Sequence, residues 1–209
     1  LLEGVGTNNF PYSVDLENPA WLPLNATVTN NVISAPNGLI EGVEIESNGV
    51  VAAQRLGEDG ITGTLTVSIF AKAGSARYLQ IIHSENAQFY ANFDLQNGTK
   101  GTFGTASKSS IEPHKNGWYR CTLTVTTTIN ARIYFYIAPS ASATYGQAYV
   151  AKVDSLYLWG AQVEQGSFAT SYIPTAGSTI TRVADTVSSS TATRTPDIAD
   201  ITGSNFSSW

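Results

Sequence analysis

The chain is poor in sulfur and in histidine. Its 209 residues include no methionine, one cysteine and two histidines. The single cysteine, Cys121, excludes an internal disulfide, and a zinc site needs more Cys and His than the chain holds. Because methionine is absent, Leu1 is not a translation start, and we expect the chain to be a processed piece of a longer protein.

Charge is also scarce, and the charge that is present is mainly acidic. Asp, Glu, Lys and Arg make up 13% of the chain, and 11 Lys and Arg face 16 Asp and Glu, for a formal net charge of −5. Nucleic-acid binding needs clustered cations that neutralise phosphates, so this balance argues against a nucleic-acid partner. No apolar run approaches the roughly 20 residues of a membrane-spanning helix, so membrane insertion is not expected.

Long helical periodicity is missing too, and short alternating runs take its place. β-branched and aromatic residues form strand-like segments at about residues 24–33, 64–72, 87–95, 117–126, 131–138 and 149–163. Asn48-Gly49 and Asn97-Gly98 are strong β-hairpin dipeptides. Short strands separated by turn residues predict an all-β protein built as an antiparallel two-sheet β-sandwich.

The segment 117–126 shows the two-faced pattern of such strands most clearly. Cys121, Leu123 and Val125 fall on one face, which predicts a core-facing row with Cys121 as a small buried hydrophobe. Trp118 and Arg120 fall on the opposite face. An aromatic ring beside a guanidinium suits a planar ligand that is rich in hydroxyl groups.

We interpret the non-core rows of three strands as a candidate carbohydrate-binding face. A sugar packs its C–H face on an aromatic ring, while amide, carboxylate and guanidinium groups bind its hydroxyls. The predicted members are Gln88, Tyr90, Asn92, Asp94, Trp118, Arg120, Arg132, Tyr134 and Tyr136. They form one face only if their strands are neighbours, and the alternative is that each aromatic covers the second sheet or a loop.

Several stretches resemble a known family. They are Tyr12-Ser13, NPAW at 18–21, TVSIFAKAG at 66–74, FDLQNG at 93–98, NGWYRC at 116–121 and LWGAQVEQGSFATSYIPT at 158–175. Together they look like the jelly-roll modules, similar to carbohydrate-binding modules, of tail-fibre and other virion proteins of bacteriophages and prophages. The resemblance covers roughly residues 10–187, and its last stretch is the most specific.

The resemblance implies a jelly roll of the concanavalin or galactose-binding-like kind. It implies a carbohydrate-binding adhesin in a virion tail or fibre, or an extracellular protein, that recognises a polysaccharide of the host surface or the environment. Its partners would be a glycan, other modules of the same fibre protein and other copies of the chain. Two alternatives stay open: a purely structural virion spacer, or an accessory domain of a polysaccharide-degrading enzyme.

The resemblance also suggests a structural calcium ion. Some related-looking jelly rolls hold Ca²⁺ between the N-terminal segment and the last strand. The plausible carboxylate pair here is Glu3 and Asp154, with loop carbonyls completing about six oxygen ligands. The alternative is that both are ordinary surface carboxylates.

Catalysis is not expected in this chain. A glycosidase needs two carboxylates across a cleft, and the acidic residues are scattered without an evident pair. Of the two histidines, His83 falls on a core row as a satisfied core or rim residue, and His114 follows Pro113 in a predicted solvated turn. No nucleophile-elbow motif is present either.

The composition divides the chain into three parts. We expect a jelly roll at 1–176, in which Trp21 packs on the core as a plug, a Ser/Thr-rich linker or arm at 177–199, and the start of a further module at 200–209. The apolar residues Phe168, Tyr172 and Ile173 lie in an otherwise polar segment. That segment would pack on a neighbouring copy or module, or fold back on its own sandwich.

Overall fold

The computed structural model describes residues 2–50, 55–59, 61–150 and 152–186. The described chain is almost entirely β, as predicted, with one short 3₁₀ turn, η1 (Lys115–Gly117). No helix in this part of the chain is long and apolar enough to cross a membrane. The strands are β1 (Gly6–Asn8), β2 (Ala26–Ser34), β3 (Ile40–Ser47), β4 (Arg55–Asp59), β5 (Gly63–Ala73), β6 (Tyr78–His83), β7 (Tyr90–Asp94), β8 (Thr99–Phe103), β9 (Lys108–Pro113), β10 (Tyr119–Thr127), β11 (Arg132–Ala138), β12 (Ser155–Gln165) and β13 (Ile180–Arg182).

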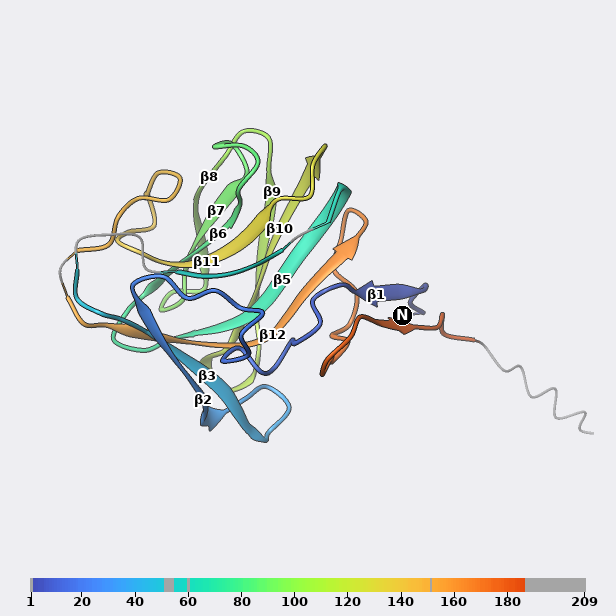
Figure 1. Ribbon diagram of the computed structural model, residues 1–209, viewed down its shortest axis with the longest axis horizontal. Coiled ribbons are helices and arrows are strands. Elements are labelled where there is room, and N and C mark those ends of the chain that lie inside the picture. Colours follow the sequence, from blue (N-terminus) through green and yellow to red (C-terminus); the bar gives the residue numbers. More distant parts are fainter. Residues whose placement is uncertain (1, 51–54, 60, 151, 187–209) are drawn as a thin grey trace, which may run out of the picture.

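Two antiparallel sheets form a sandwich (Figure 1). The six-stranded sheet has the order β2-β3-β12-β5-β10-β9, and the five-stranded sheet has the order β4-β11-β6-β7-β8. Many neighbours in each sheet are far apart in sequence, as in the pairing of β5 with both β10 and β12. The predicted all-β, jelly-roll-like sandwich is thereby confirmed.

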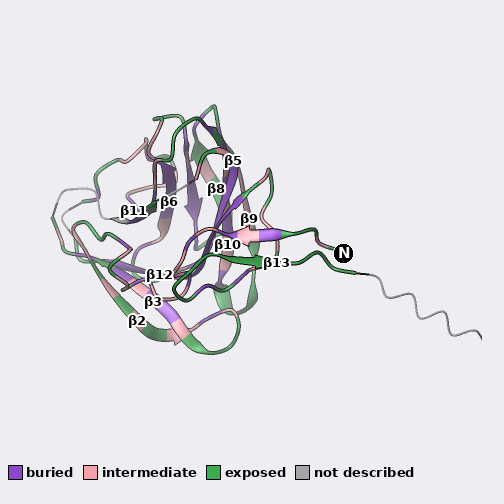
Figure 2. Cartoon of the chain, turned by 45° about the vertical axis from the view of Figure 1, so that its right-hand side comes forward, coloured by how far each residue is buried: buried purple, intermediate pink, exposed green. Residues whose placement is uncertain are grey.

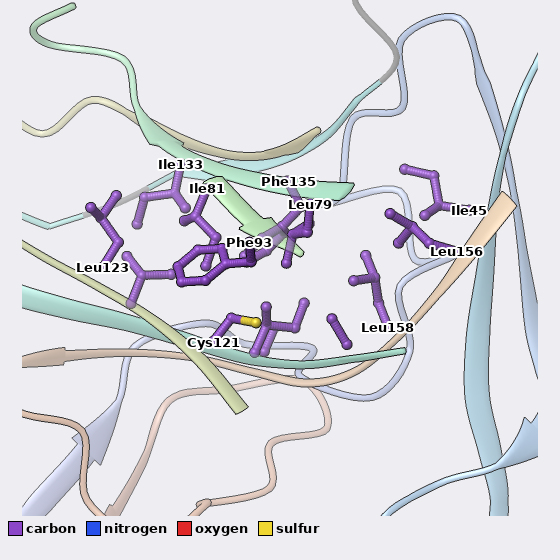
Figure 3. Close-up of a cluster of buried hydrophobic side chains, with 14 of the residues drawn as sticks. Ile45, Leu79, Ile81, Phe93, Cys121, Leu123, Ile133, Phe135, Leu156 and Leu158 are labelled. Carbon is purple, nitrogen blue, oxygen red and sulfur yellow. The ribbon is translucent and has the colours of Figure 1, made fainter. Parts of the chain in front are cut away.

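The core lies between the sheets and follows the alternation of the strands. From β10, Cys121, Leu123 and Val125 point inward, and Cys121 is fully buried as predicted (Figure 3). From the opposite sheet, Phe93 and Phe135 meet them. Burying a large apolar side chain stabilises the fold by about 1.5–3 kcal/mol, so this layer is the main source of stability.

An irregular N-terminal segment closes one side of the core. Trp21 is 2% exposed, and its ring centroid lies 5.1 Å from that of Phe10 and 6.0 Å from that of Phe135. Its indole Nε1 donates to the carbonyl oxygen of Tyr12 at 2.8 Å, so the one polar group of the buried side chain has a hydrogen-bond partner. Trp21 is therefore the plug that its size predicts.

The two ends of the described chain run side by side. β13 pairs antiparallel with β1, and Arg182 forms an ion pair with Glu3. Figure 2 shows β13 largely exposed beside the partly buried β1. The first part of the expected linker at 177–199 is thus an edge strand that folds back on its own sandwich. The remainder, with the expected further module at 200–209, lies outside the described residues.

Candidate functional site

The predicted carbohydrate-binding residues do not share one face. Seven of the nine lie on β7 or β11 or, in the case of Gln88, just before β7. Both strands are neighbours of β6 in the five-stranded sheet. β10, which follows Trp118 and contains Arg120, belongs to the six-stranded sheet. The outer faces of a sandwich point away from each other. The merged nine-residue patch is therefore wrong, and strand adjacency, which only the fold decides, is the reason.

On the five-stranded sheet a loop covers much of the predicted row. The amide of Gln80 donates to Asn92 Oδ1 at 2.6 Å and to the carbonyl oxygen of Thr144 at 3.0 Å. Asn92 in turn donates to the carbonyl oxygen of Ala143 at 2.6 Å. Gln80 and Asn92 are each 1% exposed, and Tyr136 is 5% exposed. The amide groups of Gln80 and Asn92 hold the 139–147 loop on the sheet, and none of the three side chains is open to a ligand.

Other members of this row also have intramolecular partners. Asp94 is bound by Arg77, whose Nε lies 2.8 Å from Asp94 Oδ1, and this guanidinium lowers the pKa of the carboxyl group. Arg132 pairs with Asp59 at 3.2 Å, and Gln88 Oε1 accepts from the Thr105 hydroxyl at 2.9 Å. The tyrosines contact one another and the loop, in the pairs Tyr90–Tyr145 and Tyr134–Tyr136.

Trp118 is buried and does not face solvent. It is 0% exposed, its indole Nε1 donates to the carbonyl oxygen of Ser34 at 3.0 Å, and its ring lies against Gly42. A methyl group at Gly42 would come within 3.2 Å of the indole. Trp118 therefore joins β10 to the β2–β3 hairpin. It has a structural packing role, as in the alternative to ligand binding considered for each aromatic. Of the predicted set, Arg120 is the one that lines the groove described next.

The strand register builds a row across the outer face of the six-stranded sheet. Arg120 on β10 lies opposite Glu112 on β9 and Phe70 on β5, and Phe70 lies opposite Trp159 on β12. Neighbouring strands are about 4.8 Å apart, so the four residues span about 14 Å. With Tyr172 they line an aromatic pocket of about 370 Å³, whose full lining is Pro36, Asn37, Phe70, Glu112, Pro113, His114, Arg120, Trp159, Ser171 and Tyr172.

A bulge in β12 aims Trp159 into this pocket. The register of β12 against β5 shifts between Trp159 and Gln162, around Gly160, whose φ is +63°. A Cβ on Gly160 would approach both Phe70 and Tyr172 to 3.2 Å, so glycine meets both the backbone and the space requirement. The ring centroids of Trp159 and Tyr172 are 4.6 Å apart, and those of Phe70 and Trp159 are 5.4 Å apart.

Tyr172 is fixed by its hydroxyl group. The hydroxyl lies 2.5 Å from the Ser13 hydroxyl, and burial raises the pKa of Tyr172 to about 12. It therefore stays neutral at physiological pH. Tyr172 and Ser13 come from opposite ends of the domain, so the groove depends on the N-terminal segment being in place.

A second, polar pocket adjoins the first. Rows of small hydroxyl residues, Ser110–Thr122–Ser68 and Thr124–Thr66, cross β9, β10 and β5 on the same face. All of them except the buried Ser68 line a pocket of about 220 Å³ that shares Glu112 and Arg120 with the aromatic pocket. Phe168, 70% exposed, stands on its rim. We call the two pockets together the groove.

Most of the groove could not be predicted from the sequence. Phe70 could not be linked to Arg120 from the sequence, because the two residues are about fifty positions apart and meet only through the pairing of β5 with β10. Trp159 and Tyr172 meet at the bulge around Gly160, which the strand pattern does not predict. For Phe168, the sequence suggested packing on a neighbouring copy or on its own sandwich, and only the structure places it at a polar pocket.

The two histidines are in different environments. His83 is 0% exposed, and neither ring nitrogen has a hydrogen-bond partner among the described residues, so it is a core residue but not a satisfied one. Burial lowers its pKa. His114 is exposed in its turn, as expected, and its ring meets Phe70 edge-on at 5.2 Å on the wall of the groove.

Glu3 and Asp154 do not fit a shared calcium site. Asp154 immediately precedes β12, whereas Glu3 accepts from the Ser171 amide and hydroxyl near the other end of that strand, on the order of 25 Å away. Asp154 is held by Tyr149 at 2.8 Å and Lys152 at 2.9 Å. Within the described ranges, no group of three or more His, Cys, Asp or Glu residues is arranged to hold a metal ion.

Comparisons with known proteins add a loose likeness of fold. No protein-family model matches the chain, and no curated protein sequence matches it significantly. The enzymatically active domain of tailspike protein 4 of bacteriophage CBA120 is similar over 75% of this chain and 21% of its own, at 16% identity and a TM-score of 0.42. The CBM22-1–GH10 modules of Clostridium thermocellum endo-1,4-beta-D-xylanase 10B, complexed with xylohexaose, are similar over 80% and 30%, at 11% identity and a TM-score of 0.42. Likenesses this distant carry no functional argument, so function is argued from the groove.

Proposed function

We propose that the groove binds polysaccharide and does not cleave it. The observation that carries the proposal is the row of Glu112, Arg120, Phe70 and Trp159 across four strands, beside a hydroxyl-lined pocket. Aromatic rings accept the C–H faces of sugars, and charged and hydroxyl groups bind their hydroxyls. A row of residues that extends about 14 Å across four strands suits a chain of sugars better than a small compact ligand.

The exposed ring of Phe168 supports this proposal independently. A phenyl group that is 70% exposed beside a polar pocket contributes little to the core. Its place on the rim of the pocket puts the ring within reach of a ligand in that pocket. Phe168 therefore offers a stacking platform for one sugar ring, while the hydroxyl rows below it bind the edges.

The proposed role is non-catalytic because the carboxylates in and around the groove have structural roles or stand singly. Glu164 accepts from Gln162 Nε2 at 2.5 Å and from the Thr170 hydroxyl at 2.6 Å. Glu41 accepts from Asn37 at 2.7 Å and from the Trp159 indole at 3.3 Å. Glycoside hydrolysis needs a paired acid and base or nucleophile across the scissile bond.

The biological setting we propose rests on the sequence resemblance. A module of this kind in a phage-like tail or fibre, or in an extracellular protein, would attach the particle to a polysaccharide of the host surface. Incubating the protein with each polysaccharide that it binds and assaying new reducing ends tests the non-catalytic part. A time-dependent rise in reducing ends would overturn it.

A glycan and polysaccharide array tests the binding itself. We compare the unmodified protein with Ser110→Trp, which fills the hydroxyl pocket, and with Thr99→Trp, a matched change on the exposed strand β8 of the other sheet. We expect binding to be lost in Ser110→Trp and kept in Thr99→Trp. Equal binding by both variants would place the site elsewhere, and a folded protein that binds no glycan would favour the structural-spacer function.

A further inference from the structure

Arg120 differs from the other arginines whose side chains the structure describes. Arg77 pairs with Asp94, Arg132 with Asp59, and Arg182 with Glu3. Arg120 is in none of the ion pairs found within the described ranges, although it is only partly exposed. A cation removed from bulk water without a carboxylate partner is uncommon, because the lost hydration has to be compensated.

Few contacts fix the guanidinium group of Arg120. Its Nη2 donates to the Ser68 hydroxyl at 3.0 Å, and its Cζ lies 5.5 Å from the ring centroid of Phe70. Its Nε is buried and has no hydrogen-bond partner in the described structure. A guanidinium carries five N–H donors, and the described contacts use one of them. Because Nε is enclosed by the protein, the donors left for a ligand are the N–H groups of Nη1 and Nη2 that Ser68 does not use.

The nearby carboxylates do not neutralise Arg120 by contact. Glu164 is already bound by Gln162 and Thr170. Glu112, across the strand pair, is exposed, and its charge is screened by solvent. These two carboxylates and that of Glu3 act on Arg120 only through longer-range attraction, and burial lowers the pKa of its guanidinium from the ordinary value.

We infer that the groove selects polysaccharides that carry an acidic group on the sugar ring, and that Arg120 is the residue that binds this group. The inference rests on the proposed function and specifies its ligand class. A planar carboxylate matches the fork of a guanidinium with two parallel hydrogen bonds, and a charge-assisted bond is stronger in a partly desolvated site. The sugar ring beyond the acidic group would then lie against the small parts of Phe70 and Trp159 that line the pocket, since the two side chains are only 6% and 5% exposed.

Glu112 gives the inference a second, opposite consequence. It lines both pockets beside Arg120, so it repels an acidic ligand while attracting the hydroxyls of any ligand. Removing its charge should strengthen the binding of acidic sugars, whereas removing the charge of Arg120 should weaken it. A groove that recognises only neutral sugars would show neither of these two effects of charge.

The experiment uses matched polysaccharides that differ only in charge. Polygalacturonate, alginate and hyaluronate are each compared with their methyl-esterified or carboxyl-reduced forms, and dextran sulfate is compared with dextran, by affinity electrophoresis and calorimetry on the full chain. We expect at least tenfold tighter binding to one or more acidic forms. This preference should weaken as the salt concentration rises from about 20 to about 300 mM, because screening shortens the range of the attraction between charges. Comparing the carboxylate polysaccharides with dextran sulfate then shows which acidic group the groove binds.

Variants separate this inference from the proposed function. Arg120→Gln should lose at least tenfold affinity for the acidic form, Arg120→Lys should keep part of it, and Glu112→Gln should bind it more tightly. Arg132→Gln, on the other sheet, is the matched control. Equal binding of acidic and neutral forms, or unchanged acidic binding in Arg120→Gln, overturns the inference while leaving polysaccharide binding intact. No binding of any polysaccharide overturns both.

Discussion

The indole Nε1 of Trp118 donates a hydrogen bond to the carbonyl oxygen of Ser34 at 3.0 Å, across 84 residues of sequence. The bond ties the start of β10 to the β2–β3 hairpin at the far edge of the same sheet. Phe70 and Trp159, which share a buried cluster with Trp118, lie between them. Trp118 thus packs against two residues that line the groove and holds them in place, although it is itself buried and cannot contact a ligand.

Trp118→Ala should therefore destabilise the fold and not simply remove a sugar contact. We expect a loss of about 3–5 kcal/mol in the free energy of unfolding, from the cavity and the unpaired Ser34 carbonyl. Trp118→Phe should lose less, because it keeps much of the packing. Urea unfolding followed by circular dichroism measures both, and an unchanged midpoint for Trp118→Ala would contradict the buried position.

Phe168→Ala should show the reverse pattern. The side chain is 70% exposed, so its removal should change the free energy of unfolding, measured by urea unfolding, by less than about 0.5 kcal/mol. Loss of one stacked ring should weaken polysaccharide binding by about 0.5–1.5 kcal/mol, on the order of 2- to 12-fold. Calorimetry measures the change, and Phe103→Ala, at 47% exposure on β8, is the control. Equal affinity in both variants would remove Phe168 from the site.

Asn92→Leu should release the loop that covers the five-stranded sheet. The change removes one hydrogen bond from the carbonyl oxygen of Ala143 and one from the amide of Gln80, at about 0.5–1.5 kcal/mol for each bond, because the two groups keep their bonds to the Thr102 hydroxyl and the Thr144 carbonyl oxygen. Hydrogen exchange should then speed up across residues 139–147. The exposed Gln96→Ala is the control. Exchange in this loop that matches the unmodified protein would show that the contact does not hold it.

Buried His83 should make the protein less stable in mild acid. Burial lowers its pKa, so the folded state resists a proton that the unfolded chain takes up near pH 6.5. The contribution of neutral His83 to the free energy of unfolding is fully present above that pH. It falls by at most about 1.4 kcal/mol per pH unit as the pH drops from 6.5 to the lowered pKa of the folded state. Urea midpoints between pH 7.5 and 5 measure the slope.

The control for this pH effect is His83→Leu. It should flatten the slope in that window, because it removes the titrating group. The carboxyl of Asp94, whose pKa Arg77 lowers, adds stability that is lost only at lower pH, as the pH falls from the unfolded carboxyl value through the folded one. An identical slope in His83→Leu between pH 7 and 5 would contradict the assignment to His83.

The strands and their faces could be predicted from local pattern. Alternation in β10 identified Cys121, Leu123 and Val125 as core, and the structure confirms all three. The same alternation correctly set Trp118 and Arg120 on the other face. It could not tell that one of these two is covered by a hairpin and the other lines a groove, because burial of an outward side chain depends on what packs over it.

The sequence by itself determined that this is an antiparallel β-sandwich with a Trp21 plug, since period-two alternation, turn dipeptides and side-chain size are local properties. Tertiary structure alone decided which rows meet. Pairing of β10 with β5 and β9 set Arg120 between Phe70 and Glu112, while membership of β7 and β11 in the other sheet removed Tyr90 and Tyr134 from that face. The physical reason is that strand order and register are fixed by the packing of the whole core, and a groove that crosses strands exists only after that order is set.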